Sequence, residues 1–186
     1  MSRIGQTFAP ARGNRISIAM ATYGLGQANA LRRMVRVTAA WRPLSWFYAR
    51  TLHHIDRVAF RVTRGRATFV SWVTGLPIVM LTTTGAKSGR PHTLPLVGLP
   101  EGDRLVVIAS NYGQSRNPCW YHNLRANPRA TIAFEGVTRE VTARELAGEE
   151  RERQYARGIA IYPGWREYRK RASHRQIPVV ELTPVG

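Results

Sequence analysis

Short apolar runs separated by turn residues constrain the fold of this chain more than any other feature. Several of these runs are rich in β-branched side chains, which is typical of β-strands. The runs span residues 67–73, 78–84, 93–99, 104–110, 130–134, 137–143 and 177–182. Because tight turns join many of them, the pattern predicts a mainly β (α+β) fold, a small antiparallel barrel with peripheral helices.

The run at 104–110 is nearly continuous in apolar residues, reading Arg-Leu-Val-Val-Ile-Ala-Ser. Such a run predicts a strand that is covered on both faces. Helical patterns at 120–126 and 148–155 accompany the later strands. We therefore expect a few helices at the edges of the barrel.

The N-terminal third holds most of the positive charge. The chain of 186 residues has a formal net charge of +17, and residues 1–66 contain 12 arginines and one acid. Between residues 44 and 62 the apolar side chains recur at the three- and four-residue spacing of an amphipathic helix. We expect a disordered segment 1–30, a basic helical extension 31–66 and one barrel domain 67–186. The helix either caps the barrel or lies on an anionic membrane surface.

Cysteine and histidine usage narrows the kinds of site. Cys119 is the only cysteine, so no internal disulfide is expected and a reducing cytoplasm is the expected compartment. We expect Cys119 to be a small buried hydrophobic residue. The five histidines lack the spacing of metal ligands, so no metal site is expected. No apolar run reaches the length of a membrane span.

A basic turn with two glycines lies between the runs at 78–84 and 93–99. Residues 82–92 read Thr-Thr-Thr-Gly-Ala-Lys-Ser-Gly-Arg-Pro-His. Gly85 and Gly89 can bring backbone N–H groups close to an oxyanion, and Lys87 and Arg90 add positive charge. The turn is therefore either a phosphate site or a solvated hairpin loop. It lacks the spacing of a P-loop.

A second candidate site begins at the end of the 104–110 run. Residues 109–114 read Ala-Ser-Asn-Tyr-Gly-Gln, and residues 118–128 read Pro-Cys-Trp-Tyr-His-Asn-Leu-Arg-Ala-Asn-Pro. Small residues followed by an aromatic helix start predict a flat slot for a planar ring, with backbone N–H groups as its floor and Trp120 as its wall. The alternative is that Trp120 and Tyr121 belong to the core.

Together the two segments resemble the deazaflavin (F420)-dependent nitroreductase and F420H2-dependent quinone reductase family of actinobacteria. The resemblance runs from about residue 77 to residue 184, and the use of 26 arginines to two lysines suits a high-GC genome. It implies a split β-barrel and coenzyme F420, with FMN the less favoured cofactor. It also implies hydride transfer to a quinone such as menaquinone, or to a nitroaromatic compound.

The resemblance also implies roles for the residues of this chain that match the motifs of the family. Lys87 and Ser88 would hold the phosphate of F420, with Arg90 nearby. Further cofactor-binding candidates lie at the second segment. Ala109 and Ser110 would line the deazaflavin, and Trp120 would pack at its edge.

Two positions depart from the family pattern. His92 stands where the family commonly has an arginine, and Asn111-Tyr112 replaces a smaller or more basic pair. The first change would weaken the phosphate site unless Arg90 takes over, and the second would narrow the mouth of the pocket. We keep His92 and Asn111 among the cofactor-binding candidates.

A third segment supplies the catalytic candidates. Tyr162, Trp165 and Tyr168 recur every third residue, and by resemblance they form an aromatic lid over the acceptor site. Together with Ser110 they are the residues to which we assign catalysis, with the phenols helping to donate a proton. The same spacing would also let the three rings pack against the barrel.

The resulting hypothesis is a cytoplasmic F420-dependent reductase of hydrophobic acceptors, attached at the periphery of the membrane through residues 31–66. One alternative is a deazaflavin-binding or flavin-binding carrier without activity. Another is a basic nucleic-acid-binding module, which the charge favours. No nucleic-acid-binding motif is recognisable, so we expect no nucleic acid partner.

Overall fold

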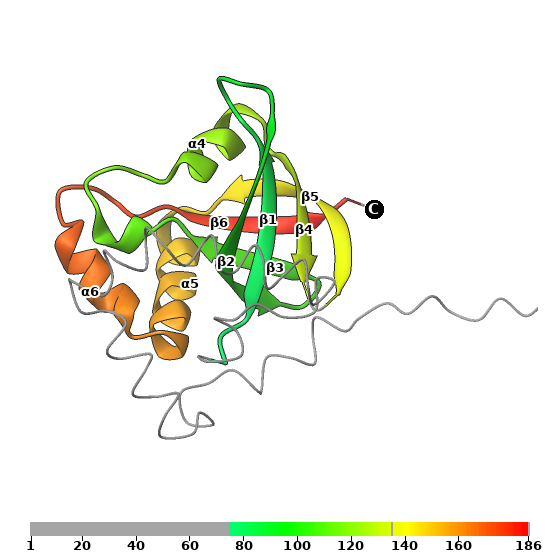
Figure 1. Ribbon diagram of the computed structural model, residues 1–186. Helices are drawn as coiled ribbons and strands as arrows, with labels where there is room; N and C mark the ends of the chain where they lie inside the picture. Colours follow the sequence, from blue (N-terminus) through cyan, green and yellow to red (C-terminus); the bar gives the residue numbers. More distant parts are fainter. Residues whose placement is uncertain (1–74, 135, 186) are drawn as a thin grey trace, which may run out of the picture.

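The computed structural model describes residues 75–134 and 136–185, and in this part of the chain six antiparallel strands close into a barrel (Figure 1). The order around the barrel is β1-β2-β3-β6-β5-β4. The strands are β1 (Ile78–Thr84), β2 (Pro91–Glu101), β3 (Arg104–Ile108), β4 (Arg129–Phe134), β5 (Val137–Glu145) and β6 (Val179–Pro184). The predicted barrel is therefore confirmed, whereas the predicted strand 67–73 and the extension 31–66 lie outside the described residues.

The strand boundaries follow the apolar runs closely, with one informative difference. β1 covers the predicted residues 78–84, while β3 ends at Ile108, before Ala109 and Ser110. The Ala109 N–H donates to Pro178 O and the Ser110 N–H turns back to Ile108 O, both at 2.9 Å. The chain thus leaves the sheet at the first of the two small residues.

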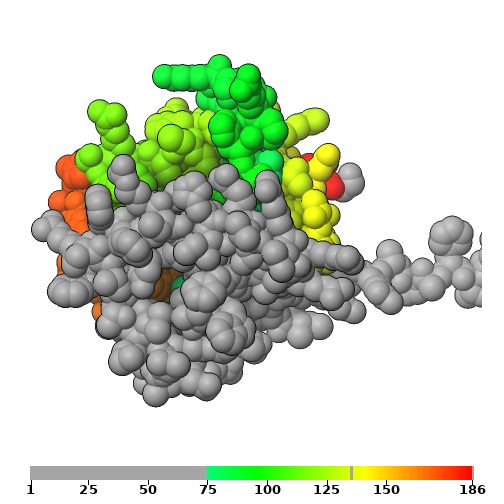
Figure 2. Space-filling model, viewed as in Figure 1, coloured from blue at the N-terminus to red at the C-terminus, as the bar shows by residue number. Residues whose placement is uncertain are grey.

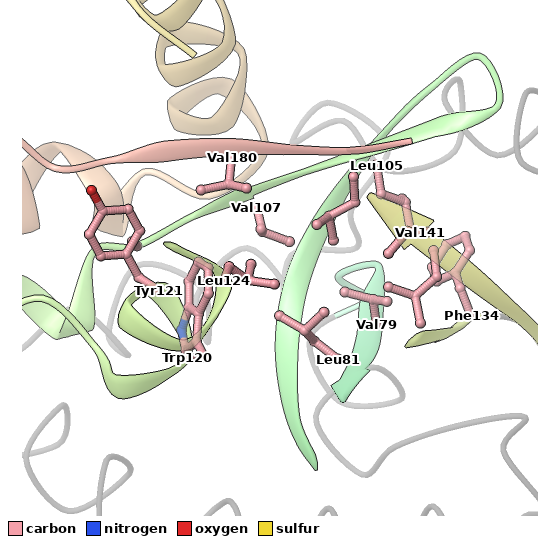
Figure 3. Packing of buried hydrophobic residues seen from close by; sticks show 13 residues of the cluster. Val79, Leu81, Leu105, Val107, Trp120, Tyr121, Leu124, Phe134, Val141 and Val180 are labelled. Carbon is pink, nitrogen blue, oxygen red and sulfur yellow. The ribbon is translucent and has the colours of Figure 1, made fainter. Parts of the chain in front are cut away.

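The barrel interior forms one of two hydrophobic cores. Strand residues such as Val79, Leu81, Val107 and Leu182 point inward, as Figure 3 shows for part of this set. Helix α4 (Cys119–Ala126) closes one end of the barrel. It contributes Trp120, Tyr121 and Leu124 to the core.

The second core lies between the outer face of the barrel and two helices, α5 (Gly148–Ile161) and α6 (Gly164–Arg171). Val106 and Ile108 of β3 face this core, while Leu105 and Val107 face the interior. This alternation confirms the prediction of a strand covered on both faces. α5 is six residues longer than the predicted 148–155.

The prediction for Cys119 is wrong, because its side chain is exposed. It opens α4 directly after Pro118, and the buried face of that helix is formed by other residues. Within residues 75–134 and 136–185, no group of three or more His, Cys, Asp or Glu side chains is placed to hold a metal ion. None of the helices in that part of the chain is both long and apolar enough to cross a bilayer.

Candidate functional site

The turn between β1 and β2 is a compact hairpin tip that extends beyond the barrel next to α4 (Figures 1 and 2). The Gly85 N–H donates to Arg90 O and the Gly89 N–H donates to Gly85 O, both at 2.8 Å. Gly89 has a φ of +64°, which favours glycine. These bonds close residues 85–90 into a small loop, which we call the hairpin tip.

A single asparagine fixes the hairpin tip to the barrel. The Asn123 side-chain oxygen accepts the Ala86 N–H at 3.0 Å, and its Nδ2 donates to Thr83 Oγ1 at 3.0 Å. Asn123 and Thr83 are both buried. Sequence reasoning missed this role, although a polar residue on the buried face of α4, between Tyr121 and Leu124, was the available signal.

The tip presents positive charge that is paired with no acidic side chain in residues 75–134 and 136–185. Lys87, Ser88 and Arg90 are exposed, and neither cation forms an ion pair with any described residue. The backbone N–H groups of Lys87 and Ser88 likewise have no hydrogen-bond partner in residues 75–134 and 136–185. Two cations and two backbone donors on one short loop fit a phosphate or carboxylate.

His92 lies against the inside of this loop. Its Nε2 is 3.3 Å from Ser88 Oγ, which also accepts the Arg90 N–H at 3.3 Å. A Cβ at position 85 would lie 2.5 Å from that hydroxyl and 2.8 Å from His92 Nε2. A side chain at position 85 would therefore require Ser88 and His92 to move, and the structure brings all the predicted residues of this segment together.

The second predicted segment differs from the expected slot. The N–H groups of Ala109, Ser110, Gly113 and Gln114 all donate to carbonyls within the chain, so they form no open floor. Trp120 is 4 % exposed and belongs to the barrel core. The roles of Ala109, Ser110 and Trp120 toward the cofactor therefore stay predictions.

Instead of a slot, residues 110–117 form a loop built around η3 (Asn111–Gly113) and fastened by Arg175. Its guanidinium donates to Ser110 O at 2.9 Å, to Gln114 O at 3.0 Å and to Asn117 Oδ1 at 2.6 Å. Desolvation by burial lowers the pKa of Arg175 below its usual value. Nothing in the sequence marked Arg175, because its partners lie about 60 residues away.

The predicted aromatic triplet lies in the second core. Tyr162, Trp165 and Tyr168 are 8 %, 4 % and 3 % exposed, and the two phenol oxygens are 2.9 Å apart. Burial is the main cause that raises the pKa of Tyr162 well above its usual value, and the Tyr168 phenol raises it further. The rings pack against the barrel, as the alternative interpretation expected, and the catalytic role of the phenol pair stays a prediction.

Most of the predicted residues fall into two clusters, whereas Ala109 and Trp120 belong to the barrel core. Lys87, Ser88, Arg90 and His92 form the first at the hairpin tip; the second combines η3 with α6, where the Tyr112 and Tyr168 rings meet with centroids 5.9 Å apart. A cleft of about 320 Å³ adjoins the foot of the hairpin and is lined by Thr82, Thr83 and Thr84 of β1 together with residues of β4 and β5.

Comparison with known proteins identifies relatives of this chain. A family model described as F420H(2)-dependent quinone reductase matches residues 55–184. An F420H(2)-dependent quinone reductase of Mycobacterium tuberculosis is 38% identical over 112 residues, which cover 58% of this chain and 73% of that protein. The solved structure of an F420-H2 dependent reductase is 39% identical with a TM-score of 0.53, covering 57% of this chain and 93% of the other. A second solved structure, a domain-swapped dimer, is 33% identical with a TM-score of 0.56, covering 75% and 98%.

Proposed function

The chain belongs to the F420H(2)-dependent quinone reductase family, and from this premise we propose that it reduces a hydrophobic quinone, with the hairpin tip as the anion site for the cofactor. Family membership makes the protein an oxidoreductase of the split-barrel type that uses coenzyme F420. The identity of the acceptor and the roles of individual residues belong to the proposal.

The observation that carries the proposal is the positive charge of the hairpin tip, which forms no ion pair within the described part of the chain. F420 has a phosphate and an acidic tail, and the tip offers Lys87, Arg90 and two unused backbone N–H groups on a loop already held in shape by Asn123. A loop that already has its bound shape loses less conformational entropy when it binds its ligand, which favours binding. The residues present therefore fit the cofactor.

When bound, the reduced deazaflavin supplies a hydride. The protein's part is to orient the ring and to exclude water. Lys87 and Arg90 would anchor the phosphate. Ala109 and Ser110, both buried at the end of β3, would line the deazaflavin ring as the resemblance to the family implies.

A quinone that accepts a hydride also needs a proton, and we assign its delivery to Tyr162 and Tyr168. Burial raises the pKa of Tyr162, which favours its protonated form, and a protonated phenol can donate a hydrogen bond to a carbonyl oxygen as negative charge develops on it. The 2.9 Å contact with the Tyr168 hydroxyl orients the pair.

A nitroaromatic compound is the second acceptor class that we propose to test, because one hydride together with one proton would reduce its nitro group to a nitroso group and release water. Quinone is preferred because the family model and the mycobacterial relative both have that description. Steady turnover with reduced F420 distinguishes an enzyme from a carrier. We further propose attachment to the inner membrane face through the basic residues 31–66, which would bring the site to a membrane-dissolved quinone.

The decisive experiment is a binding titration with oxidised F420 and with FMN, followed by fluorescence. We expect F420 to bind and FMN to bind poorly. Lys87→Ala should weaken F420 binding by about 1.5–3 kcal/mol, roughly 10- to 150-fold, because it removes a charge-assisted hydrogen bond. Lys170→Ala is the matched control, because Lys170 is the second lysine and forms an exposed pair with Glu167. Equal F420 affinity in wild type and Lys87→Ala, or preferential FMN binding, would overturn this site.

A further inference from the structure

A polar cleft adjoins the hairpin tip. It has a volume of about 320 Å³ and is lined in part by Thr84 and Pro91, the residues that directly precede and follow the tip. Lys87 is three residues from Thr84, so the Cα atoms of the two are at most about 11 Å apart. The volume of the cleft falls at the lower end of the range for small-molecule sites. One extended ligand can therefore reach both the tip and the cleft.

The strand register places hydrogen-bonding side chains next to one another along this cleft. Thr131 of β4 pairs with Thr82 of β1 on one side and with Glu140 of β5 on the other. Residues directly opposite each other in an antiparallel pair share one face of the sheet. Arg129 belongs to the same set, because it precedes Thr131 by two residues on the same strand. All four residues line the cleft, which thus combines hydroxyl groups with one cation and one carboxylate.

The charged groups of the cleft are not engaged by the protein itself. Arg129 and Glu140 are both exposed, and within residues 75–134 and 136–185 neither side chain forms an ion pair or a hydrogen bond. The backbone beside the guanidinium is held in place, because the Arg129 N–H donates to Asn127 Oδ1 at 3.1 Å. The cleft therefore offers both charges to a ligand from strands of fixed geometry.

The charge around the cleft fits an acidic chain that contains amide groups. Lys87 and Arg90 at the tip and Arg129 in the cleft give three cations, whereas Glu140 is the one carboxylate that lines the cleft. Carboxylates of a ligand would pair with Arg129, and amide N–H groups of the ligand would donate to Glu140. A ligand without donors would leave Glu140 facing only like charge, which is unfavourable.

The tail of F420 has this chemistry, because it continues from the phosphate as glutamates joined by amide bonds. The cleft also fits the order of the parts in the cofactor. Around the barrel β3 neighbours β2 and β4 neighbours β1, so Ala109 and the cleft lie on opposite sides of the β1–β2 hairpin. A cofactor with its ring at Ala109 and Ser110 and its phosphate at the tip would carry its tail toward the cleft.

We propose that this cleft is the subsite for the first part of the F420 tail, where Arg129 binds a tail carboxylate and Glu140 accepts a hydrogen bond from a tail amide. The inference deepens the proposed function and rests on it, because the phosphate must lie at the hairpin tip. The cleft adds affinity only for the forms of F420 that carry a glutamate tail. Lys87 and Arg90 act on every form that carries the phosphate.

The test is a fluorescence titration of the full chain with two oxidised forms of F420, one with several glutamates in its tail and one with none. The wild type should bind the tailed form more tightly. Arg129→Ala should weaken binding of the tailed form by roughly two- to fivefold, the range of an exposed ion pair, and leave binding of the tail-less form unchanged. Arg129→Lys keeps the charge and should retain most of the affinity. Arg153→Ala removes the same charge from α5, outside the cleft, so it is the matched control and should bind both forms as the wild type does.

Glu140→Ala separates an amide contact from simple charge repulsion. The variant loses a negative charge, which by itself would favour an acidic ligand. Loss of the hydrogen bond to a tail amide should instead weaken binding of the tailed form by about twofold. Equal or tighter binding by Glu140→Ala would overturn the role of Glu140.

Failure of this inference is distinguishable from failure of the proposed function. Equal affinity of the wild type for both forms would overturn the cleft as a subsite and leave the hairpin tip and the quinone reductase proposal intact. The same conclusion would follow if Arg129→Ala lost no affinity for the tailed form, or lost as much for the tail-less form. No binding of either form by the wild type would overturn the phosphate site and this inference together.

Discussion

Replacing Asn123 with alanine should both destabilise the domain and loosen the hairpin tip. The two hydrogen bonds of this side chain, each 3.0 Å long, join α4 to β1 and to the tip at Ala86. Its partner Thr83 is 1 % exposed, so water cannot easily replace the lost contact at Thr83 Oγ1.

The expected loss of stability in Asn123→Ala follows from the burial of Thr83 and the exposure of Ala86. Leaving the Thr83 hydroxyl buried without a partner costs about 1–3 kcal/mol, and loss of the bond to the exposed Ala86 N–H costs about 1 kcal/mol. The free energy of unfolding should therefore fall by about 2–4 kcal/mol. F420 affinity should fall by about 1 kcal/mol, roughly fivefold, because the tip must then be ordered on binding.

Urea unfolding and F420 titration measure the two effects separately. A double-mutant cycle with Thr83→Val isolates the hydrogen bond between Asn123 and Thr83. The losses in free energy of unfolding of the two single variants should add up to about 1 kcal/mol more than the loss of the double variant. His122→Ala, an exposed change on the same helix, is the control and should stay within about 0.5 kcal/mol of wild type. Normal stability and normal F420 affinity in Asn123→Ala would refute the reasoning.

Three further predictions concern other parts of the molecule. Tyr162→Phe and Tyr168→Phe should each lower turnover of a menaquinone analogue more than F420 affinity; unchanged turnover in both would show that these phenols only pack. Burial raises the pKa of Tyr155 to about 12, so its contribution to stability is complete below pH 10 and is lost as pH rises toward 12. Between pH 8 and pH 11 the free energy of unfolding, measured with urea, should fall less in Tyr155→Phe than in the wild type. An equal fall in both proteins would contradict this prediction. Liposomes containing phosphatidylglycerol should sediment the full chain in a salt-sensitive manner, but not a folded form starting near residue 65; equal pelleting of both forms, or none by the full chain, would exclude attachment through residues 31–66.

Predictions based on local spacing agreed well with the structure. The boundaries of β1 coincide with the apolar run, and β3 is buried on both faces as its continuous pattern indicates. These features follow from side chains close in sequence, whose alternation decides which face each residue occupies. The hairpin tip, with its positive charge and glycines, could be predicted for the same reason.

Buried polar partners were not predictable from the sequence. Glu181 falls within an apparently apolar run, yet it is 3 % exposed and accepts hydrogen bonds from Arg104 and Arg144 on the two neighbouring strands. These partners are 77 and 37 residues away. Only the order of strands in the closed barrel brings the three together.

By itself, then, the sequence determined the strands, the turns, the charged tip and the family, because each depends on residue type and short-range spacing. Tertiary structure alone decided that Asn123 holds the tip, that Trp120 fills the barrel and that Arg129 and Glu140 line one cleft. The physical reason is that closing the barrel sets distances between residues far apart in the chain. Those distances, together with burial, decide whether a polar or aromatic side chain packs in the core or faces a ligand.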